Sequence, residues 1–433
     1  MSAFLVRPAG PLSGSVRVQG AKNSALKLMA ASLLTSGTTE LRNVPRIADV
    51  GAMSDVLAAT GATTERRGEW LRITTPGDAV PIAPYELVER LRASVVVLGP
   101  LLARHGSAHV SLPGGDDFGP RPIDIHLRAL SELGAELTVE HGYIEGRCDR
   151  LVGQRIVFEY PSHTATDNVL MAATLAKGTT VIENAAREPE VQDLAAFLTA
   201  MGARIDGAGT ARIEIEGVEE LHPAAHTTVA DRIEAVTYLA AVGLAGGEVA
   251  VQGACAAHIE MTLEKLARMG LEIEELVGGV GARFEGRLSS VDFSTLPYPG
   301  VATDYKPMLM VMLSVASGVA IVSENIYAGR FRYVDELCRM GADIRTEGHH
   351  AVVRGVPRLS GAPVRAPDIR AGAALVLAGL AAEGETLVTG TEHVDRGYED
   401  LAGKLASLGA DVTRLTEEWS GGAGEMAADA ALP

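Results

Sequence analysis

Hydrophobic and polar positions follow a long pattern that repeats six times along the 433 residues. Each repeat contains an apolar, small-residue-rich helix, a short strand, a second and amphipathic helix, and a further strand. The second helices are expected to end at glycines spaced by roughly seventy residues. These glycines are Gly61, Gly134, Gly202, Gly270, Gly341 and Gly409. Glycine suits this place because a helix C-terminus favours a left-handed residue.

The strand that precedes each second helix begins near another glycine and is rich in β-branched residues. These glycines are Gly37, Gly106, Gly178, Gly247, Gly318 and Gly384. Short strands bounded by glycine are typical of sheets. The first helices, for example 26–34 and 371–380, are apolar on most sides and are expected to be buried. The pattern therefore predicts an α/β fold of six similar units.

Three units per domain is the natural division of 433 residues, because a chain of this length exceeds one ordinary core. We expect one domain of residues 1–21 plus 231–416 and another of residues 22–230, with a mobile loop near 112–124. Strand 4–6, together with 16–18, is expected to pair with the last unit. The Glu-, Ala- and Gly-rich stretch 417–433 is predicted to be a flexible tail.

Composition and charge limit the possible partners. The formal net charge of −17 leaves no basic surplus, which argues against a nucleic-acid partner. The longest apolar runs are too short to span a bilayer, and no signal peptide is visible, so we expect a cytoplasmic protein without a membrane partner. Cys148, Cys255 and Cys338 have no metal or redox spacing, and His349-His350 lacks a third ligand. No metal site is predicted.

Charged residues recur near the start of the first helix of each unit, where free backbone N–H groups attract anions. These places read Lys22-Asn23, Arg92-Ala-Ser94, Thr166-Asp-Asn168, Asp231-Arg232, Thr303-Asp304 and Asp368-Ile-Arg370. Asp231-Arg232 and Asp167 are interpreted as ordinary helix caps and solvated charges. Lys22 and Arg370 fit that interpretation poorly, because each stands beside an apolar or small-residue run.

Six cations form a candidate anion-binding cage drawn from both predicted domains: Lys22, Arg92, Arg121, Arg330, Arg370 and Arg396. Such a cage indicates a substrate with phosphate and carboxylate groups. The glycine-rich loop near 112–124 carries two carboxylates, Asp116 and Asp117, beside Arg121. A carboxylate on a loop next to a fixed arginine suits proton transfer at an anionic substrate, although an isolated segment of this kind is more often a surface turn.

Several motifs in order resemble the UDP-N-acetylglucosamine 1-carboxyvinyltransferase family. They are Gly20-Ala-Lys-Asn-Ser24, Leu91-Arg-Ala-Ser94, Leu112-Pro-Gly-Gly115, Arg121-Pro-Ile-Asp-Ile125, Glu183-Asn-Ala-Ala-Arg-Glu-Pro189 and Asp395-Arg-Gly-Tyr398. The resemblance implies two inside-out α/β barrel domains built from six βαβαββ-type units. It also implies transfer of the enolpyruvyl group of phosphoenolpyruvate to the 3′-hydroxyl of UDP-N-acetylglucosamine, with release of phosphate, in peptidoglycan precursor synthesis. The family's addition–elimination chemistry requires no cofactor.

The resemblance also assigns roles to residues. The catalytic set is Asp116 as proton donor, Asp304 as base, Lys22 and Arg396. Phosphoenolpyruvate is expected to contact Lys22, Asn23, Arg121, Arg330, Arg370 and Arg396. The uridine nucleotide is expected to contact Asn23, Arg92, Arg121, Pro122, Ile123, Asp124, Ile125, Ser162, His163, Thr164, Asp304 and Ile326. Asp368 is expected to support closure of the loop.

Two segments depart from the family pattern. Asp116 stands where most members carry cysteine; an aspartic acid with a raised pKa can deliver the same proton, but it lacks the thiolate that fosfomycin alkylates. We therefore expect insensitivity to fosfomycin. His163 and Thr164 stand in a segment that usually reads Ser-Val-Gly-Ala-Thr, so the acceptor remains open. The alternatives are UMP or another uridine nucleotide, as in nucleoside-antibiotic biosynthesis, and a non-catalytic uridine-nucleotide-binding regulator.

Overall fold

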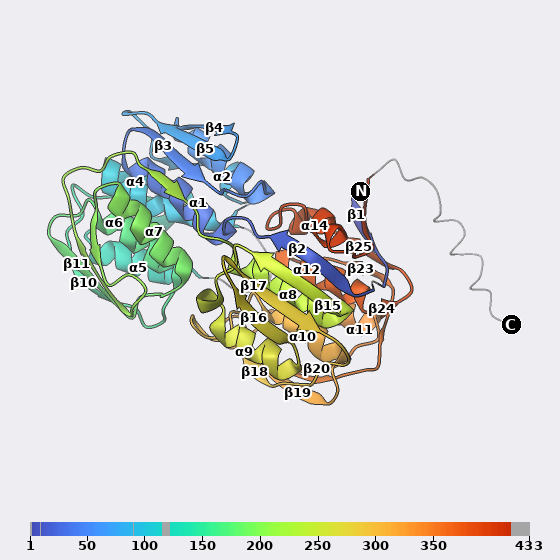
Figure 1. The fold of residues 1–433 in the computed structure, drawn as a ribbon. Helices are drawn as coiled ribbons and strands as arrows, with labels where there is room; N and C mark the ends of the chain where they lie inside the picture. Colours follow the sequence, from blue (N-terminus) through green and yellow to red (C-terminus); the bar gives the residue numbers. More distant parts are fainter. Residues whose placement is uncertain (1, 9, 90, 115–121, 417–433) are drawn as a thin grey trace.

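The computed structural model describes residues 2–8, 10–89, 91–114 and 122–416. The predicted Asp116 and Arg121, most of the loop near 112–124, and the tail 417–433 lie outside the described residues. The chain forms two lobes, each packed around its own cluster of buried residues (Figure 1). One cluster spans residues 25–221, and the other combines residues 4–18 with residues 233–412. We refer to them as the N-terminal and C-terminal lobes; domain boundaries at residues 21 and 230 stay a prediction that this division supports.

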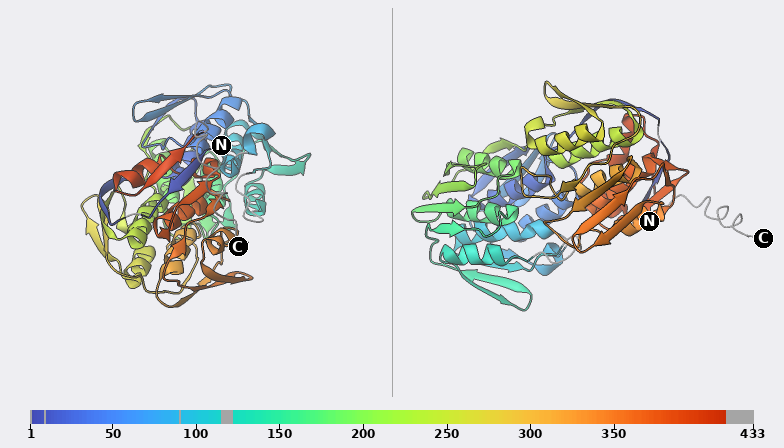
Figure 2. Two further views of the ribbon diagram at one scale, coloured as in Figure 1. Left: turned by 90° about the vertical axis from the view of Figure 1, so that its right-hand side faces the viewer. Right: turned by 90° about the horizontal axis from the view of Figure 1, so that it is seen from below.

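Each lobe contains three apolar helices in its interior and three amphipathic helices farther out (Figures 1 and 2). The interior helices are α1 (Lys22–Ala31), α4 (Leu98–His105), α6 (His163–Ala173), α8 (Arg232–Ala245), α10 (Lys306–Val315) and α12 (Ile369–Leu380). The outer helices are α2 (Ala48–Ala59), α5 (Asp124–Glu132), α7 (Pro189–Ala200), α9 (Glu260–Met269), α11 (Val334–Arg339) and α14 (Leu401–Ser407). Short helices are α3 (Tyr85–Val88), α13 (Thr391–Val394), η1 (Ser32–Leu34), η2 (Arg92–Val97) and η3 (Ala256–His258). No helix of the described chain is both long and apolar enough to cross a membrane.

Glycine ends each outer helix as predicted. All six predicted glycines have positive φ angles, from 89° at Gly341 to 113° at Gly270. The left-handed conformation turns the chain back toward the sheet without a side-chain clash. The repeat pattern is therefore confirmed at the level of each unit.

Six four-stranded sheets cover the helices within the described ranges. The N-terminal lobe contains β3 (Gly37–Arg42), β4 (Thr63–Arg67), β5 (Trp70–Thr75), β6 (Ile82–Ala83), β7 (Ser107–Ser111), β8 (Glu136–Glu140), β9 (Tyr143–Arg147), β10 (Arg155–Val157), β11 (Thr179–Glu183), β12 (Arg204–Asp206), β13 (Arg212–Glu216) and β14 (Ala225–Thr227). The C-terminal lobe contains β1 (Ala3–Val6), β2 (Leu12–Arg17), β15 (Gly247–Gln252), β16 (Glu272–Leu276), β17 (Gly279–Phe284), β18 (Phe293–Ser294), β19 (Val319–Ser323), β20 (Asp343–Glu347), β21 (His350–Arg354), β22 (Leu359–Ser360), β23 (Pro363–Arg365), β24 (Ala382–Glu383), β25 (Thr386–Thr389) and β26 (Val412–Leu415).

The sheets share one topology. Their strand orders are β14-β3-β5-β4, β6-β7-β9-β8, β10-β11-β13-β12, β2-β15-β17-β16, β18-β19-β21-β20 and β23-β25-β1-β26. Each has one parallel pair at an edge and two antiparallel pairs. The strands β22 and β24 form a separate two-stranded sheet. The six sheets are distinct, and no ladder of hydrogen bonds joins them into a closed barrel among the described strands.

The N-terminal segment completes two sheets of the C-terminal lobe. Strand β1 pairs with β25 and β26, which confirms that strand 4–6 joins the last unit. The prediction was wrong for the second strand, because β2 pairs with β15 in the fourth unit. Parallel pairing with β15 aligns Val16 with Val251, and both side chains are buried.

The chain crosses between the lobes twice, at neighbouring places. The backbone N–H of Ala21 donates to the carbonyl of Val229 at 2.6 Å, and the N–H of Asp231 donates to the carbonyl of Gln19 at 2.8 Å. These bonds hold the two crossings side by side. They also place the starts of α1 and α8 next to each other, where the cavity described below opens.

Candidate active site

A cavity of about 240 Å³ lies between the lobes. Its walls come from α1, η2 and the start of α6 on one side, and from segments 296–304, 326–330 and 369–370 on the other. Seven cationic side chains line it: Lys22, Lys27, Arg92, Arg232, Arg330, Arg370 and Arg396. Five of the six predicted cage residues are therefore brought together, and the sixth, Arg121, lies outside the described residues. Acidic residues at the wall are Asp49, Glu188 and Asp304.

Asp49 joins two cage residues from different lobes. Its carboxylate accepts from Lys22 Nζ at 2.6 Å and from Arg396 Nε at 2.8 Å. Lys22 is the first residue of α1, whereas Arg396 follows α13 in the last unit. Asp49 is buried in the first turn of α2, and sequence reasoning missed it because an acidic residue there resembles an ordinary helix-dipole partner.

Asp304 lies between two arginines of the same lobe. Its Oδ1 accepts a hydrogen bond from Arg330 Nη2 at 2.9 Å, and Arg370 Nε lies 3.9 Å from the same oxygen. Burial alone raises the pKa of Asp304, but the Arg330 and Arg370 guanidiniums outweigh it and lower that pKa below its usual range. Asp304 is therefore ionised at neutral pH, and its side chain keeps 29% exposure at the cavity.

Arg370, which lines the cavity, has one side-chain nitrogen without a hydrogen-bond partner among the described residues. Its Nη1 is buried and has no hydrogen-bond partner among the residues that the structure describes. A buried guanidinium N–H without a partner is costly, so an anion in the cavity stabilises it. The predicted contact of Arg370 with phosphoenolpyruvate stays a prediction.

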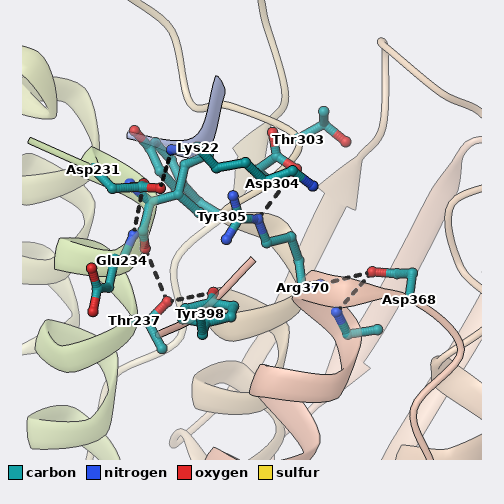
Figure 3. Close-up of polar contacts among 12 residues, drawn as sticks. Lys22, Asp231, Glu234, Thr237, Thr303, Asp304, Tyr305, Asp368, Arg370 and Tyr398 are labelled. Carbon is teal, nitrogen blue, oxygen red and sulfur yellow. Dashed lines mark hydrogen bonds and ion pairs between the residues drawn. The ribbon is translucent and has the colours of Figure 1, made fainter. Parts of the chain in front are cut away.

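Two aspartates fix the helices that carry these groups (Figure 3). Asp368 is the N-cap of α12 and accepts from the backbone N–H groups of Arg370 and Ala371, each at 2.9 Å. Asp231 is the N-cap of α8, as predicted, and also accepts from the backbone N–H of Lys22 at 3.3 Å. The two caps thus hold the cationic side chains of α1 and α12 at the cavity. A further role of Asp368 in loop closure stays a prediction.

The interpretation of Arg232 as a solvated charge was wrong. Its Nε donates to Glu190 Oε1 at 2.9 Å, and its Nη1 donates to the Tyr305 hydroxyl at 2.8 Å. Arg232 begins α8 in the C-terminal lobe, whereas Glu190 lies in the first turn of α7 in the N-terminal lobe. No local pattern predicts this pair, because the partners are distant in sequence and belong to different units.

The expected helix start at Thr166 was also misplaced. Helix α6 begins at His163, because Ser162 is its N-cap and its Oγ accepts from the backbone N–H of Ala165 at 3.4 Å. Asp167 therefore lies inside the helix and is fully buried, 3.3 Å from Lys27 Nζ. The interpretation of Asp167 as a cap was wrong. Lys27, which lines the cavity, was not predicted, because it stands within the apolar run of α1.

The residues predicted to contact the nucleotide divide into two groups. Asn23, Arg92, Ser162, His163, Thr164, Asp304 and Ile326 line the cavity. Arg92 lies in η2, a 3₁₀ helix, and not at the start of an α-helix. Pro122, Ile123, Asp124 and Ile125 are described but are not among the residues that line the cavity. They lie at the start of α5, directly after the residues that the structure does not describe.

The site's chemistry is that of an anion-binding cavity with an ionised carboxylate. Cations from both lobes can hold phosphate and carboxylate groups, while Asp304 can accept a proton from a hydroxyl group. In the part of the chain that is described, no group of three or more His, Cys, Asp or Glu side chains could hold a metal ion.

Comparisons with known proteins agree with this chemistry. A family model described as EPSP synthase (3-phosphoshikimate 1-carboxyvinyltransferase) matches residues 6–405. A UDP-N-acetylglucosamine 1-carboxyvinyltransferase from Magnetococcus marinus is 49% identical over 419 residues, which cover 96% of this chain and 100% of the relative. A protein of the same name from an Anaeromyxobacter species (strain K) is 50% identical over 421 residues, with the same coverage.

Solved structures show the same fold. The enolpyruvyl transferase NikO from Streptomyces tendae aligns with a TM-score of 0.85 at 26% identity, covering 96% of this chain and 99% of that one. EPSP synthase from Acinetobacter baumannii aligns with a TM-score of 0.73 at 18% identity, covering 96% and 100%. At that identity the second likeness concerns the fold alone.

Proposed function

This chain belongs to the UDP-N-acetylglucosamine 1-carboxyvinyltransferase family, and we propose that it transfers the enolpyruvyl group of phosphoenolpyruvate to the 3′-hydroxyl of UDP-N-acetylglucosamine. Phosphate is the second product, and the reaction serves peptidoglycan precursor synthesis. The observation that carries the proposal is Asp304, an ionised carboxylate held between Arg330 and Arg370 in a cavity lined by cations of both lobes.

The reaction needs a base, an acid and cations. The acceptor oxygen adds to C2 of phosphoenolpyruvate as its proton leaves, while C3 gains a proton; C3 then loses a proton as phosphate departs. Asp304 is the proposed base at the hydroxyl, and Asp116, which lies outside the described residues, is the proposed acid at C3. Lys22, Arg330, Arg370 and Arg396 hold the phosphate and carboxylate groups.

Substrate binding also tunes Asp304. In the structure, Arg330 and Arg370 lower the pKa of Asp304, which makes it a weak base. When the anionic groups of phosphoenolpyruvate pair with these guanidiniums, their positive field at Asp304 is neutralised, and the pKa of Asp304 rises. The carboxylate therefore becomes a better proton acceptor only after the substrate is bound.

Phosphate release from phosphoenolpyruvate tests the proposal, with UDP-N-acetylglucosamine, UMP or no nucleotide as the acceptor. Turnover with UDP-N-acetylglucosamine and none without an acceptor is the expected result. Turnover with UMP alone would refute the proposed acceptor and favour the second candidate. Binding of nucleotide without turnover by either acceptor would favour a regulator.

The second candidate, transfer to UMP or a related uridine nucleotide, is favoured by one observation. His163 and Thr164 bring two side chains into the cavity wall at the start of α6, where the family pattern has the smaller Val-Gly pair. Larger side chains at this wall leave less room in the cavity, which suits a smaller acceptor. The 49–50% identical relatives named for UDP-N-acetylglucosamine support the first candidate more strongly.

A further inference from the structure

His163 and Thr164 line the cavity, and each contacts a buried residue of another helix. His163 contacts Lys27 of α1, whereas Thr164 contacts His126 of α5. Both side chains can donate or accept hydrogen bonds, so their partners decide whether each one presents a donor or an acceptor to a ligand. The donor and acceptor roles in these two contacts therefore decide whether this part of the cavity suits an anion.

Lys27 fixes the proton of His163. Lys27 Nζ lies 3.3 Å from His163 Nε2 and 3.3 Å from Asp167 Oδ2. An ammonium group only donates, so Nε2 must be the acceptor, and the single proton of a neutral imidazole then lies on Nδ1. Burial, together with the nearby Lys27 charge, lowers the pKa of His163 to about 3, which keeps the ring neutral.

Asp167 is the competing partner of His163. Its Oδ2 lies 3.5 Å from His163 Nε2, which is longer than the contact with Lys27. A proton on Nε2 would place N–H against the ammonium of Lys27, which has no acceptor to offer. The arrangement in which Lys27 donates to His163 Nε2 and forms an ion pair with Asp167 Oδ2 gives the ring nitrogen a donor and the carboxylate a cation. Asp167 therefore anchors Lys27, and the proton of His163 stays on Nδ1.

The second contact begins at Asn168, whose amide orientation is settled by its neighbours. Its Oδ1 accepts from the backbone N–H of Gly99 at 2.7 Å, and its Nδ2 donates to the carbonyl of Val95 at 3.0 Å. The same Nδ2 lies 3.1 Å from His126 Nδ1. Since Nδ2 can only donate, His126 Nδ1 is an acceptor, and the ring proton lies on Nε2.

His126 then sets the direction of the Thr164 hydroxyl. His126 Nε2 lies 3.2 Å from Thr164 Oγ1 and donates to it. The hydroxyl proton of Thr164 is left for another acceptor, and Oγ1 makes no second hydrogen bond among the described residues. Burial lowers the pKa of His126 to about 4, so this ring is neutral as well and carries one proton.

We propose that Lys27 and the Asn168–His126 pair are positioning residues that make His163 Nδ1–H and the Thr164 hydroxyl two hydrogen-bond donors for a phosphate group of the acceptor nucleotide. The inference rests on the proposed function, which places a uridine nucleotide in this cavity. Both donors lie in the first turn of α6, where free backbone N–H groups and the helix dipole also favour an anion. Side-chain donors thus replace the close backbone approach that glycine permits.

A nitrogen NMR spectrum of protein with isotope-labelled histidine directly tests the tautomers expected for His163 and His126. We expect opposite tautomers in one molecule, with His163 protonated on Nδ1 and His126 on Nε2. The signals of His163 and His126 are assigned by their loss in His163→Asn and His126→Asn. A His163 proton on Nε2, or a His126 proton on Nδ1, would overturn the inference without any need for turnover.

Steady-state kinetics test whether these donors bind the acceptor nucleotide. Lys27→Met is expected to raise the KM for UDP-N-acetylglucosamine about tenfold, the factor of one hydrogen bond to a charged group, with kcat unchanged. Thr164→Val is expected to do the same, whereas Thr164→Ser retains wild-type KM. The matched control is Lys177→Met, which removes an exposed lysine of the same lobe and leaves KM unchanged. A fall in kcat with an unchanged KM would refute a positioning role.

A double variant separates positioning from packing. In His163→Asn, the side-chain amide supplies a permanent N–H near the place of Nδ1, so the donor no longer depends on Lys27. Adding Lys27→Met to His163→Asn is expected to raise KM no further, whereas an additional tenfold rise would show that Lys27 acts independently. If no acceptor supports turnover, the proposed function fails, whereas the NMR spectrum still shows whether His163 and His126 carry their protons on the expected nitrogens.

Discussion

The ion pair between Glu190 and Arg232 is the contact whose loss is expected to weaken the joint between the lobes most. The two side chains are only 1% and 7% exposed, and Arg232 Nε lies 2.9 Å and 3.2 Å from the two carboxylate oxygens. The perturbation is Arg232→Met, which keeps most of the side-chain length but removes the charge. It leaves Glu190 buried without its cation.

Two routes give the same magnitude. Removing one partner of a buried ion pair costs about 3–5 kcal/mol, because the other charge stays desolvated. Burial raises the pKa of Glu190, but Arg232 outweighs burial and lowers it from 4.5 to about 2, a difference equivalent to about 3 kcal/mol. Because the folded-state pKa is the lower one, this stability is present above pH 4.5 and is lost as the pH falls through 2.

Urea unfolding at pH 7 is the assay, applied to the wild type, Arg232→Met, Glu190→Gln and the double variant. Each single variant is expected to lose about 3 kcal/mol, and the double variant clearly less than the sum. Arg268→Met is the control, because the exposed Arg268–Glu264 pair is expected to contribute under about 1 kcal/mol. If Arg232→Met is no more destabilised than Arg268→Met, the reasoning about this buried pair is wrong.

Three further predictions concern the site. Asp304→Asn is expected to lower kcat by about 10²–10⁴, the usual contribution of a general base, while nucleotide binding measured by calorimetry persists. Below pH 6.5 His126 is protonated in the unfolded chain, whereas the buried ring of the folded protein stays neutral until about pH 4. The free energy of unfolding of the wild type is therefore expected to fall by up to about 3 kcal/mol more than that of His126→Asn as the pH falls through this window. Equal losses of the two proteins in urea unfolding would contradict this. Fosfomycin is expected to leave the wild type active and to inactivate Asp116→Cys with time, because only the variant has a thiolate at that position; mass spectrometry showing labelling of the wild-type loop would count against it.

The elements of the fold could be predicted because they depend on local chemistry. Glycines at helix ends and β-branched strands after glycine repeat in all six units, and the positive φ angles at Gly61 and its equivalents follow from helix capping alone. All six cage cations were predicted, because the openings of the first helices and the loops before the second helices recur at equivalent places in the units, and five of them line the cavity.

The remaining site residues depend on contacts that no local pattern encodes. Glu190 and Arg232 pair across lobes, and Asp49 contacts Arg396 although nearly the whole chain separates them. Lys27 stands in an apolar run, so its charge gave no sign of facing Asp167. The partner of β2 was missed for the same reason: it is chosen by packing in three dimensions, and not by the sequence of the strand itself.

Asp49 explains how two cations from different lobes stay together at the cavity. Its single negative charge holds Lys22 and Arg396 together across the lobes, so their mutual repulsion is offset before any substrate arrives. An anion that enters between these two cations competes with that carboxylate. The contact that assembles the site is thus also one that an incoming phosphate or carboxylate group has to displace or share.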